Sequence, residues 1–491
     1  MQKREAHAIP LCLTYDDVLL VPQMSSVRSR KNVKTTTRLS RNITLNIPLV
    51  ASNMDTVCEQ RMAIAMAREG GIGILHRFCS VEEQCEMLRE VKRAQSFLIE
   101  NPRMILPHQT AHEADVGLKW GGKVGGIGCL MVVDSIEKRK LLGIITKRDL
   151  VFAKADQTVE SLMTPVQQMV VSTNVKLTLQ DACELMRTNR TANIPIVGPQ
   201  GELLYLVTLS DVIKLTRNRN ASLDSRGRLL VGAAIGVKND DMERAAALVQ
   251  NGADVLVVDI AHGHSSMCID MVKRLKSDSR TRHVDVIAGN IATAEAAEAL
   301  ISAGADGLKI GVGPGSICIT RLVAGAGVPQ LSAVMECARA AHKGGVPCIA
   351  DGGVRTSGDV SKAIAAGADT VMLGNMLAGT DEAPGRVLVK DGQKVKIIRG
   401  MAGFGANLSR LERERTLDED VFASMVPEGV EGNVPCKGPV GPIVRQLVGG
   451  LRSGMSYCGA QNIAEMHKYA KFVRITGAGL RESGSHTISK I

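Results

Sequence analysis

One cysteine lies in a glycine-rich segment, Gly311-Val-Gly-Pro-Gly-Ser-Ile-Cys-Ile-Thr320, which follows the apolar run Ala305 to Ile310. Glycines allow backbone amides and carbonyls to come close to a bound molecule. Cys318 therefore stands where a nucleophile would stand, and the hydroxyl of Thr320 follows two residues later. A buried structural cysteine is the common alternative. It suits the other eleven cysteines better than it suits Cys318.

A nucleophile needs a scaffold, and short apolar runs along the chain predict β-strands. Most of them precede a helical pattern, and from the third onward they recur at roughly 20–30 residues, which is typical of βα units. Eight such units predict a TIM barrel in an α/β protein, with a doubly wound sheet as the alternative. The runs are Leu45 to Ala51, Gly70 to Leu75, Leu229 to Ile235, Asp254 to Ile260, Asp285 to Gly289, Ala305 to Ile310, Val346 to Asp351 and Thr370 to Gly374.

Polar and glycine-rich motifs follow several of these runs. In a TIM barrel the chemistry lies at the carboxyl ends of the strands, so we expect these motifs to converge there. They are Ser52-Asn53-Met54-Asp55, Asp259-Ile-Ala-His-Gly-His264, Gly289-Asn290, the cysteine segment, Asp351-Gly-Gly353 and Gly374-Asn375.

A long interruption, residues 95–222, predicts a separate domain between two barrel parts, 1–94 and 223–491. Leu142 to Leu150 and Leu204 to Val212 both read as a strand, a threonine, two residues, an aspartate and a helix. Such an internal repeat predicts a pseudo-twofold module. The two halves resemble a pair of CBS motifs, which commonly bind adenine or guanine nucleotides. We therefore expect a purine nucleotide effector at this domain.

Composition narrows the classes of function. The chain has 491 residues and a formal charge of +10, but only 2% of its residues are aromatic. A basic chain with little capacity for base stacking favours a small anionic substrate over nucleic acid. The twelve cysteines show neither disulfide nor zinc spacing. No signal peptide or membrane-spanning run is evident, so a soluble protein in a reducing compartment is expected.

The last three residues, Ser489-Lys490-Ile491, resemble the peroxisomal address Ser-Lys-Leu. We expect a peroxisomal or glycosomal location, with the cytoplasm as the alternative.

The cysteine segment, Asp351-Gly-Gly353, Arg399-Gly-Met401 and the stretch 426–432 together resemble the IMP dehydrogenase/GMP reductase family over essentially the whole chain. The resemblance implies an oxidoreductase of purine nucleotide metabolism, in which Cys318 adds to purine C2. Hydride moves between that carbon and a nicotinamide. It also implies a homotetramer, or an octamer paired through the CBS modules.

The resemblance assigns roles to further residues by the part of the ligand that each would contact. Asp351 would hold the ribose hydroxyls. The remaining assignments are Ser316, Gly353, Gly374 and Asn375 for the nucleotide phosphate and its surroundings, Met401, Ala402 and Glu428 for the purine, Asp259, Ala261 and Gly311 for the nicotinamide cofactor, and the carbonyls of Gly313, Gly315 and Cys318 for a potassium ion.

Several residues favour the reductase reaction of the family. Glu336 and Thr320 would handle protons on a departing amine. The mobile flap of the dehydrogenase carries an Arg-Tyr pair, whereas this chain has Arg415 followed by Thr416. Asp259-Ile-Ala261 and Leu331-Ser332 also have the reductase form.

Other residues favour the dehydrogenase. The stretch 426–437 and Arg399-Gly-Met401 have its form, and CBS insertions are usual in dehydrogenases. Arg77 replaces a reductase lysine, and arginine gives up its proton less readily. Ile398 stands where a phosphate-binding tyrosine is usual.

Because Glu336 and Thr416 concern the step that separates the two reactions, we expect NADPH-dependent reductive deamination of GMP to IMP and ammonia through a covalent Cys318 adduct. The alternative is NAD-dependent oxidation of IMP to XMP. A nucleotide-sensing scaffold without catalysis is disfavoured by the intact Cys318, Thr320 and Asp351.

Overall fold

The computed structural model describes residues 9–94, 97–99, 101–119, 128–175, 177–217, 220–238, 240–406, 408 and 426–484. The chain divides into two compact units. We call residues 1–92, 220–222 and 229–491 the barrel unit, and residues 93–219 and 223–228 the inserted unit. Arg415, Thr416 and Ser489-Lys490-Ile491 lie outside the described residues.

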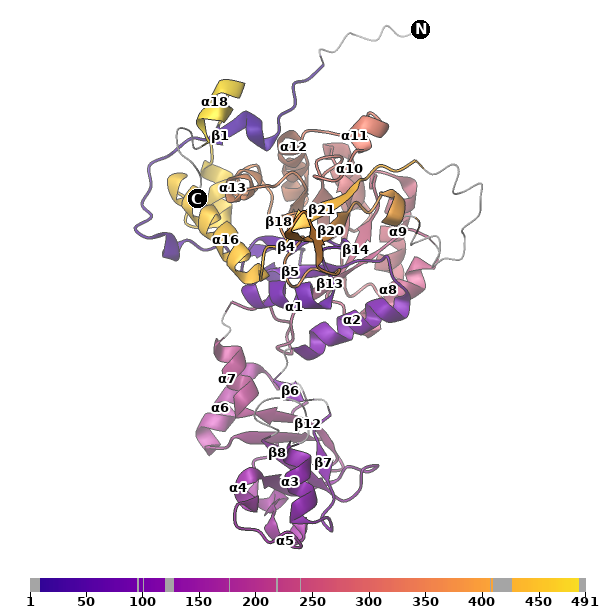
Figure 1. The fold of residues 1–491 in the computed structure, drawn as a ribbon, viewed down its shortest axis with the longest axis vertical. Helices are drawn as coiled ribbons and strands as arrows, with labels where there is room; N and C mark the ends of the chain where they lie inside the picture. The colour runs from indigo at the N-terminus through magenta and orange to yellow at the C-terminus, as the bar shows by residue number, and fades with distance from the viewer. Residues whose placement is uncertain are drawn as a thin grey trace. The chain divides into compact units, whose positions relative to one another are not determined.

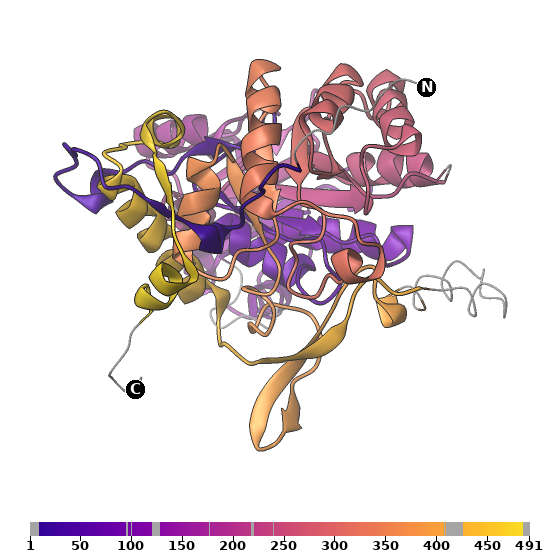
Figure 2. The same cartoon turned by 90° about the horizontal axis from the view of Figure 1, so that it is seen from above.

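The barrel unit is built on eight parallel strands that close into a barrel (Figures 1 and 2). Each strand overlaps one of the eight apolar runs, and β15 extends two residues beyond its run, so the predicted TIM barrel is confirmed. In order around the barrel the strands are β4 (Leu49–Ala51), β5 (Ile72–Leu75), β13 (Val231–Ile235), β14 (Val255–Asp259), β15 (Asp285–Ile291), β16 (Gly307–Ile310), β17 (Cys348–Asp351) and β18 (Thr370–Leu373).

Helices between the strands cover the barrel, and local sequence signals set their ends. Helix α1 ends at Gly70, whose φ of 102° is left-handed. Helix α13 begins with a capping box between Thr356 and Asp359. The covering helices are α1 (Gln60–Glu69), α2 (Val81–Ala94), α8 (Asp241–Gln250), α9 (Ser266–Ser277), α10 (Ala294–Ser302), α12 (Gln330–Lys343), α13 (Ser357–Ala365), α16 (Val440–Tyr457) and α17 (Ile463–Tyr469).

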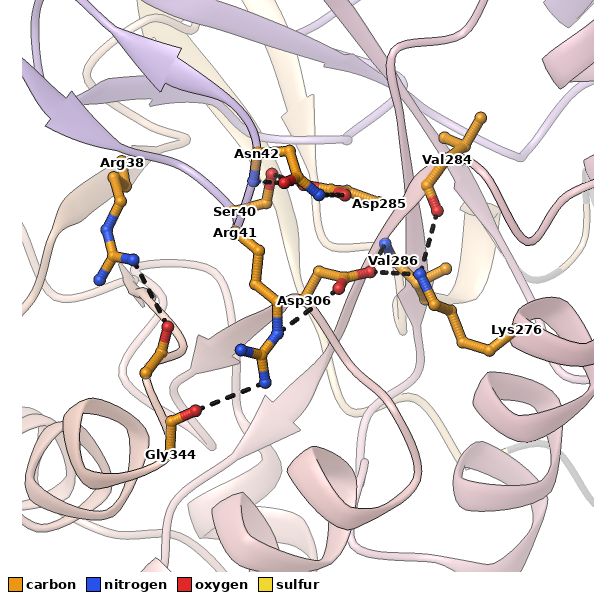
Figure 3. A network of polar contacts seen from close by, with 11 residues as sticks. Arg38, Ser40, Arg41, Asn42, Lys276, Val284, Asp285, Val286, Asp306 and Gly344 are labelled. Carbon is orange, nitrogen blue, oxygen red and sulfur yellow. Dashed lines mark hydrogen bonds and ion pairs between the residues drawn. The ribbon is translucent and has the colours of Figure 1, made fainter.

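The amino-terminal end of the barrel is closed by the hairpin of β2 (Thr37–Arg38) and β3 (Thr44–Leu45). The buried carboxylate of Asp285 accepts from Ser40 Oγ at 2.6 Å and from the backbone and side chain of Asn42 at 2.9 and 2.7 Å (Figure 3). Nearby, Asp306 pairs with Lys276 at 2.7 Å (Figure 3). Polar contacts therefore fill this end.

A three-stranded antiparallel sheet in the order β19-β20-β21 belongs to the same unit. In its register Arg399 lies opposite Glu431. The sheet therefore brings the residues after β20 next to those before β21. Its strands are β19 (Leu388–Lys390), β20 (Gln393–Arg399) and β21 (Glu431–Pro435).

Shorter elements complete the barrel unit: η1 (Tyr15–Asp17), β1 (Val18–Leu20), η2 (Arg30–Asn32), α11 (Thr320–Val323), β22 (Phe472–Arg474) and α18 (Gly477–Glu482). No helix among the described residues is both long enough and apolar enough to cross a membrane.

The inserted unit contains two sheets, ordered β10-β9-β8-β7 and β11-β12-β6. Thr146 caps α4 in a capping box with Asp149, and Thr208 bonds to Asp211 at 2.6 Å at the start of α7. The repeated threonine and aspartate thus cap equivalent helices. Residues 223–228 join this unit rather than the barrel, because Leu223 packs on its core.

The elements of the inserted unit are β6 (Leu98–Ile99), β7 (Met104–Ile105), α3 (Ala111–Lys119), β8 (Cys129–Val133), β9 (Leu141–Thr146), α4 (Lys147–Leu150), α5 (Val159–Leu162), β10 (Thr164–Pro165), η3 (Val166–Gln168), α6 (Leu179–Asn189), β11 (Asn193–Val197), β12 (Leu203–Thr208) and α7 (Leu209–Arg217).

Candidate active site

Side chains from the carboxyl ends of four barrel strands meet around one buried lysine. Lys309 of β16 pairs with Asp259 of β14 at 2.7 Å and with Asp351 of β17 at 2.9 Å. Asn290 of β15 donates to Asp351 at 2.9 Å, and Asn53, after β4, donates to Asp259 at 2.9 Å. The expected convergence of these motifs is therefore present in the fold.

Lys309 and Asp259 stabilise each other's charged forms. Burial by itself raises the pKa of Asp259, but the ammonium of Lys309 outweighs it and the pKa lies below its ordinary value. Burial by itself lowers the pKa of Lys309, but the carboxylates of Asp259 and Asp351 outweigh it and the pKa is raised. A buried lysine between two carboxylates fixes both acids in place.

The cysteine segment packs directly on the Asp351 turn. A side chain at Gly311, with φ of 149°, would overlap the carbonyl oxygen of Asp351. A Cβ at Gly352, with φ of 94°, would lie 3.0 Å from the Pro314 ring and 3.2 Å from the nitrogen of Gly315. Glycine is required at both positions because the two turns touch through their backbones.

Cys318, Thr320 and Glu428 form a line of three reactive side chains. Cys318 Sγ lies 3.1 Å from Thr320 Oγ1, which donates to Glu428 Oε2 at 2.8 Å. Cys318 is half-buried, whereas Cys129 and Cys268 are buried. The thiol is accessible, and a hydroxyl and a carboxylate are arranged beside it to move a proton.

Backbone hydrogen bonds between the cysteine segment and residues 428–430 hold Cys318, Thr320 and Glu428 in this arrangement. Ile319 N donates to Glu428 O at 2.8 Å, and Val430 N donates to Ile317 O at 2.9 Å. Glu428 N in turn donates to Ala402 O at 3.0 Å. The residues that flank β20 and β21 therefore lie against the cysteine segment, and the assignment of Met401, Ala402 and Glu428 to the purine stays a prediction.

The predicted pairing of Thr320 with Glu336 is wrong. The buried side chains of α12 include Val334, Cys337 and Ala338, and Glu336 lies on the exposed side of that helix. Its carboxylate accepts from the nitrogen of Ala294 at 3.2 Å, at the start of α10. The carboxylate that bonds to Thr320 is Glu428.

The predicted phosphate residues lie at neighbouring strand ends. Gly353, with φ of 81°, lies beside Pro314, and Gly374 lies beside Met54 after β4. Ser316 and Asn375 are exposed. Backbone amides at such turns suit an anion, so the assignment to phosphate stays a prediction.

The residues predicted to face the nicotinamide lie on the same rim. Asp259 is engaged by Lys309 and Asn53, Gly311 adjoins Asp351, and Ala261 is exposed. Arg77 also lies near Asp259 and lowers its pKa. An open apolar residue beside these charges is compatible with a nicotinamide, and the assignment stays a prediction.

The predicted potassium ligands fit less well. The carbonyl of Gly315 accepts from Cys318 N at 3.1 Å. The side chain of Arg321 lies against Gly313, where its Nε would be 2.7 Å from a Cβ. A guanidinium beside Gly313 opposes a cation there, so no step of the reaction is derived from potassium.

Lys309 is the functional residue that the sequence analysis missed. Its signal was a single charged residue within the otherwise apolar strand β16. The bond between Glu428 and Thr320 was also missed, because it joins residues 108 positions apart.

A TIM barrel with an accessible thiol, a hydroxyl and a carboxylate at its strand ends defines an enzyme of covalent thiol chemistry. The family model "IMP dehydrogenase / GMP reductase domain" matches residues 12–486. The chain belongs to this family and is an oxidoreductase.

Individual relatives cover nearly the whole chain. GMP reductase of Leishmania major is 73% identical over 483 residues, which are 98% of each chain. Inosine-5'-monophosphate dehydrogenase of Nitrosopumilus maritimus is 49% identical over 97% of this chain and 98% of that one.

Two solved structures of Trypanosoma brucei GMP reductase are similar. The C318A form in complex with guanosine 5'-monophosphate has a TM-score of 0.87 at 76% identity and covers 98% of this chain and 99% of its own. The complex with guanosine 5'-triphosphate has a TM-score of 0.76 at 68% identity and covers 96% and 99%.

Proposed function

We propose that this chain catalyses the NADPH-dependent reductive deamination of GMP to IMP and ammonia. The observation that carries the proposal is the line from Cys318 through Thr320 to Glu428. The identity of 73% to a GMP reductase, against 49% to an IMP dehydrogenase, supports the same direction.

The line of side chains accounts for deamination step by step. The Cys318 sulfur forms a bond to purine C2, and its proton passes toward Thr320 and Glu428. The same pair returns a proton to the amine, so that the bond from C2 to nitrogen breaks and ammonia leaves. Bound NADPH supplies the hydride that reduces C2. The bond from C2 to sulfur then breaks, which releases IMP and leaves a Cys318 thiolate that takes up a proton from solvent before the next turnover.

Asp351 is placed to hold the substrate during these steps. Both of its hydrogen bonds to Asn290 and Lys309 fall on Oδ2. The carboxylate is thereby fixed with Oδ1 on its other side, where it can accept from ribose hydroxyls. Its contact with Gly311 ties ribose binding to the position of the cysteine segment.

The direction of the reaction is tested with two substrate pairs. Purified protein is offered GMP with NADPH and, separately, IMP with NAD, and nicotinamide absorbance is followed. We expect oxidation of NADPH only in the presence of GMP, with stoichiometric ammonia. Turnover with IMP and NAD alone would contradict the reductase assignment.

We also propose that the inserted unit is a CBS pair that binds a purine nucleotide. A pocket of about 460 Å³ lies in this unit, and its lining includes Lys138, Arg139 and Tyr205 together with Glu137 and Glu202. Two cationic side chains and an aromatic ring suit a nucleotide. The potassium ion, the tetramer or octamer and the peroxisomal or glycosomal location stay predictions.

A further inference from the structure

Two histidines and an aspartate outside the candidate active site come together from distant parts of the barrel unit. His342 ends α12, Asp369 immediately precedes β18, and His467 lies in α17. One possible ligand atom from each lies within 4.8 Å of the others. Asp369 stands at the amino-terminal end of its strand, opposite the end that carries Asp351, so the proposed reaction does not use this cluster.

The aspartate and the first histidine lie slightly closer together than two ligands on one zinc ion would. His342 Nε2 lies 3.0 Å from Asp369 Oδ2. Zinc bonds of about 2.0–2.2 Å in a tetrahedron place neighbouring ligand atoms about 3.2–3.6 Å apart. The carboxylate is also fixed, because its Oδ2 accepts from Cys348 N at 2.9 Å.

The second histidine has the tautomer that a ligand needs. His467 Nε2 lies 3.0 Å from the carbonyl oxygen of Ala368, and a carbonyl only accepts, so this nitrogen donates. The lone pair of the neutral ring is therefore on Nδ1. A histidine that binds a metal commonly donates its other ring N–H to such a carbonyl.

The two rings lie together and leave access for an ion. The rings of His342 and His467 stack with centroids 5.2 Å apart. The His342 side chain is 35% exposed, which leaves room for entry and for a water as fourth ligand.

We propose that His342, Asp369 and His467 form a Zn²⁺ site that fastens α17 to the base of the barrel. Two imidazoles and one carboxylate suit zinc and similar late first-row metals, whereas magnesium and calcium prefer oxygen ligands alone. Because the ligand atoms are up to 4.8 Å apart, binding draws the cluster together by on the order of 1 Å.

The test uses the full chain with Cys318→Ala, which removes the active-site thiol as a competing ligand. Co²⁺ is titrated as a spectroscopic probe and Zn²⁺ is added to displace it. In this background the cluster variants are His342→Gln and His467→Gln. The matched control is His283→Gln, which changes an exposed histidine away from the cluster.

We expect one equivalent of Co²⁺ to give visible d–d bands without thiolate charge transfer. Each cluster variant should weaken binding by more than about tenfold, while His283→Gln binds as its parent does. Zn²⁺ should raise the Tm of the parent and the control but not of the cluster variants. The metal-free Tm of each variant shows whether it is folded.

Equal Co²⁺ affinity in all four chains would overturn the proposal, as would a thiolate spectrum. In either case the three side chains serve only as a polar contact between α12, β18 and α17.

Discussion

At the scale of single residues, the reaction depends on which carboxylate serves Thr320. Glu428 accepts its hydroxyl at 2.8 Å, whereas Glu336 is exposed and accepts from a helix nitrogen. A carboxylate without contact to the hydroxyl cannot relay its proton. In the proposed mechanism Glu428 therefore takes the role that the sequence pattern assigned to Glu336.

This distinction predicts opposite outcomes for two similar substitutions. Glu428→Gln should lower kcat for GMP by about 10²- to 10⁴-fold, because the amide cannot take up the proton. Glu336→Gln is the control and should stay within about threefold of the parent, since its carboxylate contacts no reacting group. Steady-state kinetics with GMP and NADPH measure both.

Single-turnover kinetics add a sharper criterion. If the Glu428→Gln variant released ammonia at the parent rate, the relay would be contradicted. A large loss of kcat in the Glu336→Gln variant would instead support the predicted pairing of Glu336 with Thr320.

Lys309 is a buried charge whose importance comes from its position between two carboxylates. It is 3% exposed and touches both Asp259 and Asp351. Loss of the ammonium would leave two buried carboxylates uncompensated, which is the costly way to break a buried ion pair. The lysine thus connects the proposed cofactor rim with the proposed ribose site.

At the scale of elements, some glycines are needed because a neighbouring segment leaves no room for a side chain. Helix α16 carries adjacent glycines, Gly449 and Gly450. A Cβ at Gly449 meets no atom within 4 Å, whereas one at Gly450 would overlap the side chain of Ser357 at the start of α13. The two residues have the same helical conformation but different neighbours.

Alanine substitutions at these two positions should therefore change stability in opposite directions. Gly449→Ala should raise the free energy of unfolding by about 1 kcal/mol through helix propensity. Gly450→Ala should lower it by about 1–3 kcal/mol through overpacking. Urea unfolding of both variants provides the measurement, and a stabilised Gly450→Ala would show that α16 does not pack on α13 as described.

At the scale of the whole molecule, the two units have separate cores. Leu45, Ile74 and Val257 belong to the core of the barrel unit. Phe97 and Ile194 belong to a core of the inserted unit. Separate cores allow the units to unfold as distinct cooperative transitions and to respond to different ligands.

Calorimetry of the full chain should therefore show two transitions that different nucleotides shift. GMP should raise the midpoint temperature of the barrel transition, and GTP should raise that of the inserted unit. At a hundredfold excess over Kd, each ligand should add about 2.7 kcal/mol to the free energy of unfolding of the unit that it binds. Gly450→Ala, which acts on the barrel, identifies its transition. A shift of the barrel transition alone by GTP would argue against nucleotide binding at the inserted unit.

The sequence by itself determined the elements of this protein. Apolar runs that are buried on both faces specify parallel strands, because this signal is local in the sequence. The motifs after the strands could be placed at one end of the barrel, since all parallel strands point the same way. Cys318 was identified by its glycine-rich setting.

Only the tertiary structure decided which side chains meet. The bond from Thr320 to Glu428 and the bridge from Asp259 through Lys309 to Asp351 join segments far apart in the chain. The rotation of α12, set by packing its apolar face on the barrel, turned Glu336 away from the thiol. Such contacts depend on packing between elements, which no local pattern of residues encodes.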